Sequence, residues 1–214
     1  MKIAVLGGTG SFGRALAGRL AALGSDKVVI GSRDAERARE TARALGGSGA
    51  GGSRISGATN EEAVGGADLA VLAVKAEGAL DTARAVASAL GATPLLCVAS
   101  AIEFRKGVGM LPDPEALSLA ERVQEIVQAP VVAGLHSIAA ANLEEEPPDE
   151  DALICGDDPN AKELVLAVAG RLVAGRALDA GPLASARALE GLTAVIVNLN
   201  RRYKAHAGLR VTGL

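Results

Sequence analysis

Three glycines near the amino terminus, Gly8, Gly10 and Gly13, have the spacing of a nucleotide-binding turn. They follow an apolar run at residues 3–6 and precede a helical pattern, which is the strand–turn–helix context that a dinucleotide fingerprint requires. Gly8 would permit the tight turn, Gly10 would let the backbone approach a pyrophosphate, and Gly13 would let the helix pack closely on the strand. The pyrophosphate would lie at the helix N-terminus, where free N–H groups and the helix dipole favour an anion.

The residues after the second apolar run, at 28–31, distinguish between two dinucleotides. An NAD site usually places Asp or Glu here to hold the ribose 2′-hydroxyl. This chain instead has Ser32 and Arg33, with Arg37 one helical turn later. Such side chains donate hydrogen bonds to a 2′-phosphate, which a carboxylate would repel. The pattern predicts NADP, and the alternative is that both arginines are solvated residues at the start of a helix.

The two histidines, His136 and His206, offer little acid–base chemistry. His136 follows an expected strand at 131–133, on the edge where doubly wound sheets bind ligands. A neutral imidazole there could hydrogen-bond a cofactor ring, or it could be a locally satisfied residue at a strand end. His206 lies beside Arg201, Arg202 and Lys204, either as a solvated tail residue or as one that meets an anionic ligand or partner chain. No His/Cys cluster has zinc-like spacing, so we expect no metal site.

Short apolar runs alternate with helical patterns along the chain, which is typical of parallel strands covered by helices. We expect strands at 3–6, 28–31, 54–56, 69–73, 94–98, 131–133, 152–155 and 176–180. We expect helices at 11–23, 34–45, 77–90, 114–128, 160–172 and about 183–205. The prediction is an α/β, Rossmann-type, doubly wound and mostly parallel sheet with a C-terminal helical segment, all in one domain over residues 1–214.

Two connections and the last helix complete this organisation. A glycine- and serine-rich stretch at 46–53 is expected to be a mobile loop, and an acidic stretch at 144–151 a solvated, exposed one. The last helix carries a broad apolar stripe that includes Leu189, Leu192, Ile196 and Leu199. Its width suggests packing on the body of the domain, together with a contact in a homodimer.

The composition excludes several classes of function. A net charge of −3 argues against a nucleic-acid surface or a polybasic membrane patch, and no apolar segment has the length of a membrane span. Because Met1 lies almost directly before a strand, we expect no cleavable signal. Cys97 and Cys155 lie in apolar runs and are expected to be buried free thiols, which fits a reducing cytoplasm. Only 1% of the residues are aromatic, so aliphatic side chains and backbone must hold any ligand ring.

Several blocks of the chain together resemble one family, the NADPH-dependent reductases of the 5-deazaflavin coenzyme F420. The blocks are Leu6-Gly-Gly-Thr-Gly10 with Gly13, Gly31-Ser-Arg33, Asp68-Leu-Ala-Val-Leu72, Leu135-His-Ser-Ile138, Cys155-Gly-Asp-Asp158, Leu178-Asp-Ala-Gly-Pro-Leu183 and Leu192-Thr193. They span almost the full chain in order. The resemblance implies one Rossmann-type domain in which NADP lies at the glycine fingerprint and the deazaflavin stacks against the nicotinamide. It implies direct hydride transfer between the two rings, with the organic chemistry supplied by the cofactors.

The resemblance also implies roles for individual residues. Thr9, Ser32, Arg33 and Arg37 match the family's NADP contacts, whereas His136 and Ile138 match residues beside the deazaflavin. The complete set of cofactor-binding candidates is Gly8, Thr9, Gly10, Ser11, Phe12, Gly13, Ser32, Arg33, Arg37, Ala73, Val74, Val98, His136 and Ile138. The chain departs from the family at 74–78, which lacks the usual proline, and at 98–103, which replaces a proline-rich loop. Both loops should line the side of the site that holds the second substrate.

The expected function is therefore that of an oxidoreductase that transfers a hydride between NADP(H) and coenzyme F420. One alternative is an NADP-dependent reductase of another small acceptor on the same fold. Another is a non-catalytic, NADP-sensing domain that signals through an oligomer interface. The expected partners are small-molecule redox cofactors and a second copy of the chain in a cytoplasmic homodimer, with no nucleic acid and no membrane.

Overall fold

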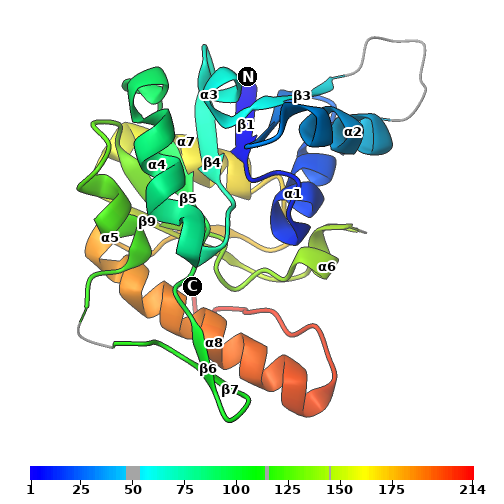
Figure 1. The fold of residues 1–214 in the computed structure, drawn as a ribbon. Helices are drawn as coiled ribbons and strands as arrows, with labels where there is room; N and C mark the ends of the chain where they lie inside the picture. Colours follow the sequence, from blue (N-terminus) through cyan, green and yellow to red (C-terminus); the bar gives the residue numbers. More distant parts are fainter. Residues whose placement is uncertain (47–53, 114–115, 145) are drawn as a thin grey trace.

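The computed structural model describes residues 1–46, 54–113, 116–144 and 146–214. Within them, an eight-stranded sheet has the order β10-β9-β8-β5-β4-β1-β2-β3 (Figure 1). Its strands are β1 (Lys2–Leu6), β2 (Lys27–Ser32), β3 (Ile55–Thr59), β4 (Leu69–Leu72), β5 (Leu95–Cys97), β8 (Val131–Gly134), β9 (Ala152–Gly156) and β10 (Ala177–Asp179). Each strand overlaps one of the expected strands. The inner strands β1, β4, β5 and β8 are apolar because they are buried on both faces, whereas the edge strands β3 and β10 are only partly buried.

The strand order reverses between β1 and β4, both of which pair with neighbours in parallel. Strands β3, β2, β1, β4, β5 and β8 are parallel, which confirms the predicted Rossmann-type, mostly parallel sheet. β9 is antiparallel to β8, with Val132 opposite Gly156, and β10 is parallel to β9. The start of β9 therefore lies at the carboxyl edge of β8, and its end lies at the amino edge.

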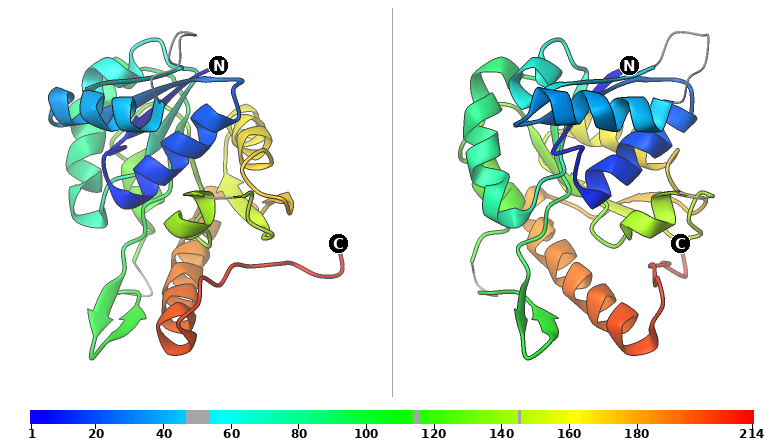
Figure 2. Two further views of the ribbon diagram at one scale, coloured as in Figure 1. Left: turned by 90° about the vertical axis from the view of Figure 1, so that its right-hand side faces the viewer. Right: turned by 45° about the vertical axis from the view of Figure 1, so that its right-hand side comes forward.

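Helices cover both faces of the sheet (Figure 2). They are α1 (Ser11–Ala22), α2 (Ala35–Gly46), α3 (Asn60–Val64), α4 (Ala76–Leu90), α5 (Leu119–Gln124), α6 (Ala140–Glu144), α7 (Pro159–Ala169) and α8 (Ala186–Tyr203). Ile3 and Val5 pack with α1, α2 and α7 on one face. Ala4 and Leu6 pack with α3, α4 and α5 on the other. This alternation follows from the two-residue period of a strand.

Several expected elements have different bounds. The helix expected at 114–128 is only α5, which begins after a capping box formed by Ser118 and Glu121; residues 114–115 lie outside the described residues. The last helix begins as a 3-10 turn at Leu183–Ser185 and ends at Tyr203, before a left-handed Lys204. Of the expected loop at 46–53, residues 47–53 lie outside the described residues.

A β-hairpin that the sequence did not predict follows β5. It consists of β6 (Glu103–Arg105) and β7 (Val108–Met110), joined by Lys106 and Gly107. Both turn residues have positive φ, +50° and +82°, as a two-residue hairpin turn of type I′ requires. The hairpin projects beside α8 and away from the sheet (Figure 2). Its strands have three residues each and are only partly buried, so they give no apolar run long enough to detect.

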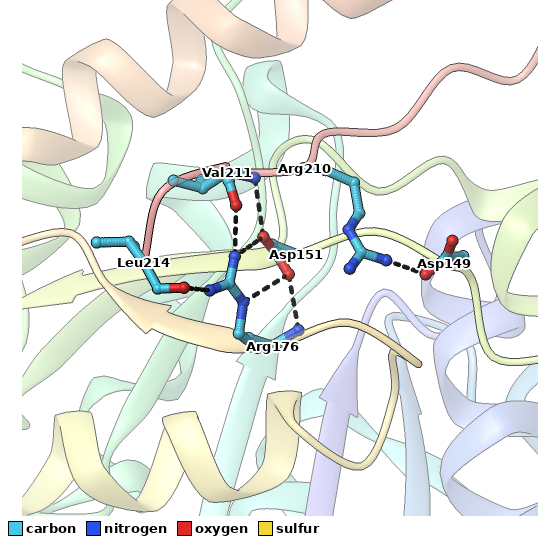
Figure 3. A network of polar contacts seen from close by, with 6 residues as sticks. All are labelled: Asp149, Asp151, Arg176, Arg210, Val211 and Leu214. Atoms are coloured by element: carbon cyan, nitrogen blue, oxygen red, sulfur yellow. Dashed lines mark hydrogen bonds and ion pairs between the residues drawn. The ribbon is translucent and has the colours of Figure 1, made fainter.

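The acidic stretch at 144–151 is not exposed throughout, because Glu150 and Asp151 are buried. Asp151 accepts hydrogen bonds from the backbone N–H groups of Arg176 and Val211, at 2.8 and 2.9 Å, and pairs with the Arg176 guanidinium at 2.9 Å (Figure 3). Arg176 also donates to the carbonyl oxygens of Val211 and Leu214. The Asp151 carboxylate is thus buried because it binds the C-terminal tail to the edge of the sheet. Charge patterning in the sequence does not predict such a long-range contact.

Candidate active site

The glycine-rich turn lies at the carboxyl end of β1. Gly7, and not Gly8 as expected, has the left-handed conformation of the tight turn, with a φ of +73°. At Gly13 a Cβ would lie 2.6 Å from the Gly7 carbonyl oxygen, so close packing of helix and strand explains this glycine. At Gly10 a Cβ would meet only the Gly7 carbonyl oxygen, at 3.3 Å. The backbone at Gly10 therefore faces open space, in which a pyrophosphate fits.

The start of α1 provides the donors for such an anion. Gly10 precedes this 12-residue helix in an extended conformation and supplies no capping side chain. The first-turn N–H groups of a helix are left for an anionic ligand when no side chain caps them. Thr9 is half-buried and Ser11 is exposed beside this turn. Phe12 packs against the core, so its side chain anchors the turn.

The end of β2 was expected to select the cofactor. Ser32 is buried and accepts a hydrogen bond from the Asp34 backbone N–H at 3.2 Å. Asp34 is the first carboxylate after β2, but its Oδ1 accepts from the backbone N–H groups of Glu36 and Arg37, at 2.9 and 3.2 Å. It therefore begins α2 as a capping residue. A carboxylate engaged in this way does not replace the Asp or Glu of an NAD site.

Arg33 and Arg37 are both exposed and lie one helical turn apart. Glu36 pairs with Arg39 at 3.2 Å and with Arg43 at 2.7 Å. Arg33 and Arg37 have no ion-pair partner in the part of the chain that the structure describes. Two uncompensated guanidinium groups at the end of β2 fit a 2′-phosphate, and the residues present thus fit NADP.

Asn60 contributes to this edge although the sequence analysis assigned it no role. It is 5% exposed, and its Oδ1 accepts a hydrogen bond from the Gly7 N–H at 3.4 Å. A Cβ at Gly31 would lie 2.7 Å from the same oxygen, so the amide joins the ends of β1 and β2. The available signal was the capping box of Thr59 and Glu62, which places the start of a helix at Asn60.

The ends of β4 and β5 lie beside the glycine turn. The Ala73 N–H donates to the Leu6 carbonyl at 2.9 Å, and the Val98 N–H donates to the Leu72 carbonyl at 3.3 Å. The chain thus continues to pair for one residue beyond each strand. A Cβ at Gly7 would lie 2.5 Å from Cγ1 of Val74, so this side chain packs directly on the turn. The structure therefore brings Ala73, Val74 and Val98 to the fingerprint edge.

A strained turn after β8 positions His136 and Ile138. Leu135 is buried and has a φ of +63°, in the left-handed region that bulky residues rarely adopt. The Ile138 N–H closes the turn on the Leu135 carbonyl at 3.1 Å. Such strain persists only where the surrounding structure enforces it, and it gathers at functional sites.

His136 is only 7% exposed, and among the described residues its ring makes at most a weak contact, with the backbone of Ala99. Burial lowers the pKa of His136 to about 4, and the nearby backbone of Ala99 opposes part of that effect. The imidazole is therefore neutral at physiological pH and is unsuited to donate a proton as a general acid there. A buried polar group without a partner costs free energy, and a ligand that hydrogen-bonds the ring would recover it.

Helix α8 joins the loops that follow β5 and β8. The Thr193 hydroxyl donates to the His136 carbonyl oxygen at 2.9 Å. Since that hydroxyl has one proton, the Ser100 hydroxyl donates to Thr193 Oγ1, at 3.0 Å. Sequence spacing gave no signal for this chain of contacts, because its members are 57 and 93 residues apart.

Two of the motif blocks lie away from this edge. Asp157 accepts from the Leu183 N–H at 2.9 Å, and Asp158 begins α7 by accepting from the Ala161 N–H at 2.8 Å. Asp179 pairs with Lys162 at 2.9 Å. Because β9 is antiparallel to β8, these residues lie at the amino edge of the parallel strands. Asp157 thus holds the turn that leads into α8, whereas Asp158 and Asp179 contact α7.

The fold and the glycine turn define a Rossmann-type dinucleotide-binding protein, and residues 2–99 match the family described as NADP oxidoreductase coenzyme F420-dependent. The chain is 34% identical over 226 residues to the F420-dependent NADP reductase of Methanocaldococcus jannaschii, and 36% identical over 223 residues to that of Methanothermobacter marburgensis. Each alignment covers 100% of this chain and 99% of the relative. The chain therefore belongs to the family of F420-dependent NADP oxidoreductases.

A solved structure supports the same fold over the whole length. The crystal structure of a protein from Arthrobacter sp. FB24, provisionally named an F420-dependent NADP reductase, has a TM-score of 0.86 and 26% identity, and the match covers 100% of both chains. Among the described residues, no helix is long and apolar enough to cross a membrane. Those residues also contain no group of three or more His, Cys, Asp or Glu side chains arranged to hold a metal ion.

Proposed function

We propose that this protein is an oxidoreductase that transfers a hydride between NADP(H) and coenzyme F420. The observation that carries the proposal is the full-length similarity to the two methanogen reductases, at 34% and 36% identity. The bound cofactors supply the hydride and its acceptor ring. The chain's task is to bind the two rings, orient them at reacting distance and exclude water.

The NADP half of the site is the glycine turn with the end of β2. The first-turn N–H groups of α1 would hold the pyrophosphate, and Arg33 and Arg37 would hold the 2′-phosphate. Three observations support this placement: the open space at Gly10, the uncapped helix start and the two unpaired guanidinium groups.

The acceptor half is the edge formed by the ends of β4, β5 and β8. Val74, Val98 and Ile138 are aliphatic, and such side chains can pack on the faces of two stacked rings. The neutral His136 would hydrogen-bond the edge of the deazaflavin, which would give its ring a stronger bond than the weak contact with Ala99. Thr193 would keep the His136 loop in position through its bond to the backbone carbonyl. No residue in this arrangement is required to transfer a proton.

The test is to mix the protein with NADPH and oxidised F420 and to follow the deazaflavin absorbance. Loss of that absorbance, dependent on protein and on NADPH, is the expected result. A reductase of another small acceptor is the second candidate, because the loops at 74–78 and 98–103 depart from the family pattern; it predicts NADPH oxidation only with a different acceptor. NADPH binding without turnover across a panel of acceptors would contradict both and would favour an NADP-sensing domain.

We also propose that the protein is a homodimer that uses the outer face of α8. Only part of the expected apolar stripe on α8 is buried in the structure. Leu189 and Ile196 pack against the body of the domain. Val195, Leu199 and Tyr203, spaced four residues apart, are 53%, 38% and 68% exposed. Exposed apolar side chains in one row mark an interaction surface. Sedimentation of the wild type and of a Val195→Asp, Leu199→Asp variant tests the proposal, which expects a dimer that the substitutions convert to a monomer.

Two further expectations remain proposals. We propose that residues 1–214 act as one domain, which is supported by the continuous sheet that runs from β10 to β3. We propose a cytoplasmic location, which is supported by the free and buried thiols of Cys97 and Cys155. Burial raises the pKa of each thiol to about 12, so neither is a reactive thiolate.

A further inference from the structure

The hairpin β6–β7 is fastened to α8 by one asparagine. The Asn198 side chain accepts a hydrogen bond from the Gly109 N–H at 2.7 Å and donates one to the Gly109 carbonyl at 2.9 Å. Its amide thus pairs with β7 as a neighbouring strand would. The hairpin and the last turns of α8 project together beyond the sheet (Figures 1 and 2).

Four exposed cations lie on the turn of the hairpin and at the end of α8, and we name them the tip cluster: Lys106, Arg201, Arg202 and Lys204. The Arg201 guanidinium lies 5.6 Å from the centre of the Phe104 ring, and one of its nitrogens is 3.2 Å from the position of a Cβ at Gly107. Arg201 therefore brings the last turn of α8 to the turn of the hairpin, where Lys106 lies.

The tip cluster carries positive charge that nothing nearby neutralises. All four side chains are exposed, and none has an ion-pair partner in the described part of the chain. The one carboxylate on the hairpin strands, Glu103, already pairs with Arg105. Because the whole chain has a net charge of −3, this concentration of cations is a local feature.

Helix stability alone does not account for the cluster. Cations in the last turn of a helix interact favourably with its dipole, which would explain Arg201 and Arg202. It does not explain Lys106, which belongs to a different element. Lys106 has a φ of +50°, at a turn position that Gly, Asn or Asp adopts at lower cost. A lysine at this position is unfavourable for the turn, and binding of an anion would account for it.

Both elements of the projection pass the acceptor half of the site. The hairpin continues the loop after β5 that contains Ser100, and α8 passes His136 at Thr193. From Thr193 to Tyr203 the helix runs ten residues, or about 15 Å at 1.5 Å per residue. A ligand whose ring lies beside His136 could reach the tip cluster with an extended side chain of that length.

Coenzyme F420 has such a side chain, in which a phosphodiester is followed by glutamate carboxylates. We propose that the tip cluster binds this anionic side chain while the deazaflavin ring lies beside His136; the inference rests on the proposed function. Guanidinium and ammonium groups form charge-assisted hydrogen bonds with phosphodiester and carboxylate oxygens. The chain would thus bind its two anionic substrates by separate basic groups, NADP at the end of β2 and F420 at the tip of α8.

The test compares F420 with the truncated deazaflavin that has the same ring but lacks the phosphodiester and the glutamates. The variant combines Lys106→Ala, Arg202→Ala and Lys204→Ala, and leaves Arg201 in place because it packs on Phe104. A matched control removes three exposed cations elsewhere, with Lys27→Ala, Arg54→Ala and Arg122→Ala. The Michaelis constants for both deazaflavins and for NADPH are measured at low and at high salt.

The wild type is expected to have a Michaelis constant for F420 roughly tenfold below that for the truncated compound, the scale of several exposed charge contacts. High salt should remove most of this preference. The tip-cluster variant should lose the preference for F420 while its Michaelis constant for NADPH stays unchanged. The control variant should keep the preference. Equal Michaelis constants for F420 and the truncated compound in the wild type would overturn the proposal. A tip-cluster variant that keeps the preference for F420 would also overturn it.

A separate outcome concerns the activity itself. If neither deazaflavin is reduced, the proposed function fails, and equilibrium titration of deazaflavin fluorescence then decides the binding question. Salt-sensitive binding of F420 that is tighter than binding of the truncated compound, and that the tip-cluster variant loses, would still support the inference. Equal binding of the two compounds would overturn it. Replacement of Lys106 by Arg should preserve the preference, because the charge remains.

Discussion

Thr193 Oγ1 lies 2.9 Å from the carbonyl oxygen of His136, although the two residues belong to different layers of the molecule. The bond is made to the backbone, so it fixes the position of the turn and leaves the imidazole free for a ligand. Ser100 donates to the same hydroxyl, which ties the loop after β5 to the loop after β8. In the proposed function, the acceptor side of the site would therefore be assembled only when α8 is in place.

Arg33→Ala is expected to weaken NADPH binding by roughly 2–3 kcal/mol, the scale of a lost hydrogen bond between charged groups. NADH binding should be nearly unchanged, because NADH has no 2′-phosphate. Titration calorimetry with both nucleotides measures the difference. Arg39→Ala is the matched control, since Arg39 already pairs with Glu36. Equal weakening for both nucleotides would assign Arg33 a structural role.

Gly10→Val should abolish dinucleotide binding while the protein remains folded. Within 4 Å a Cβ at Gly10 meets only the Gly7 carbonyl oxygen, at 3.3 Å, so a small shift of the turn would admit it and the side chain would occupy the space expected for the pyrophosphate. Thermal melting and nucleotide titration are measured together. A folded variant with unchanged affinity would show that the cofactor binds elsewhere.

His136→Ala should lower turnover, or raise the Michaelis constant for the acceptor, on the order of tenfold to a hundredfold through mispositioning of the ring. NADPH affinity should barely change. Steady-state kinetics with each substrate varied in turn separates these effects. A loss of many orders of magnitude would indicate acid–base catalysis and a carbonyl or imine substrate. No kinetic effect, with lowered thermal stability, would make the residue structural.

The pH dependence of stability provides a second test of His136. Its pKa falls from 6.5 to about 4 on burial, so in that window the unfolded chain binds a proton that the folded chain excludes. The free energy of unfolding should therefore fall as pH drops from 6.5 towards 4, at up to about 1.4 kcal/mol per pH unit for this one group. Denaturant unfolding at several pH values should give a smaller slope for His136→Asn.

Asp151→Asn should lower the melting temperature and expose the C-terminal tail to proteolysis. The Arg176 guanidinium and backbone hydrogen bonds hold the pKa of Asp151 far below its ordinary value of 3.8. The stabilisation is therefore fully present above pH 3.8 and is lost as the pH falls further. Asp149→Asn is the control in the same loop, because Asp149 is exposed and its one ion pair among the described residues is with Arg210. Limited proteolysis should cleave the first variant sooner than the control.

The strands could be predicted from the sequence because buried parallel strands are continuous apolar runs, as at 69–72 and 131–134. The direction of β9 in the sheet could not be predicted, since its apolar pattern is the same in either orientation. The glycine spacing and the basic residues after β2 indicated the edge at which we propose that the cofactor binds, and that assignment stays a prediction. The role of Gly7 was missed because four glycines lie between residues 7 and 13, and spacing alone does not show which one has positive φ.

The contacts made by α8 were beyond prediction for a different reason. The bonds from Thr193 to His136 and from Asn198 to Gly109 join residues that are 57 and 89 positions apart. No local propensity encodes such pairs. The hairpin is a similar case, because its short, partly buried strands are stabilised by α8 and give no apolar signal of their own.

The course of α8 from one edge of the sheet to beyond the other has a practical consequence for protein engineering. The Asp157 carboxylate holds the Leu183 N–H at the amino edge, while the same helix later contacts the His136 loop at the carboxyl edge. A substitution at Asp157 could therefore change acceptor kinetics without any contact with a ligand. Libraries designed to alter acceptor choice should include the start of α8 as well as the loops around the ring.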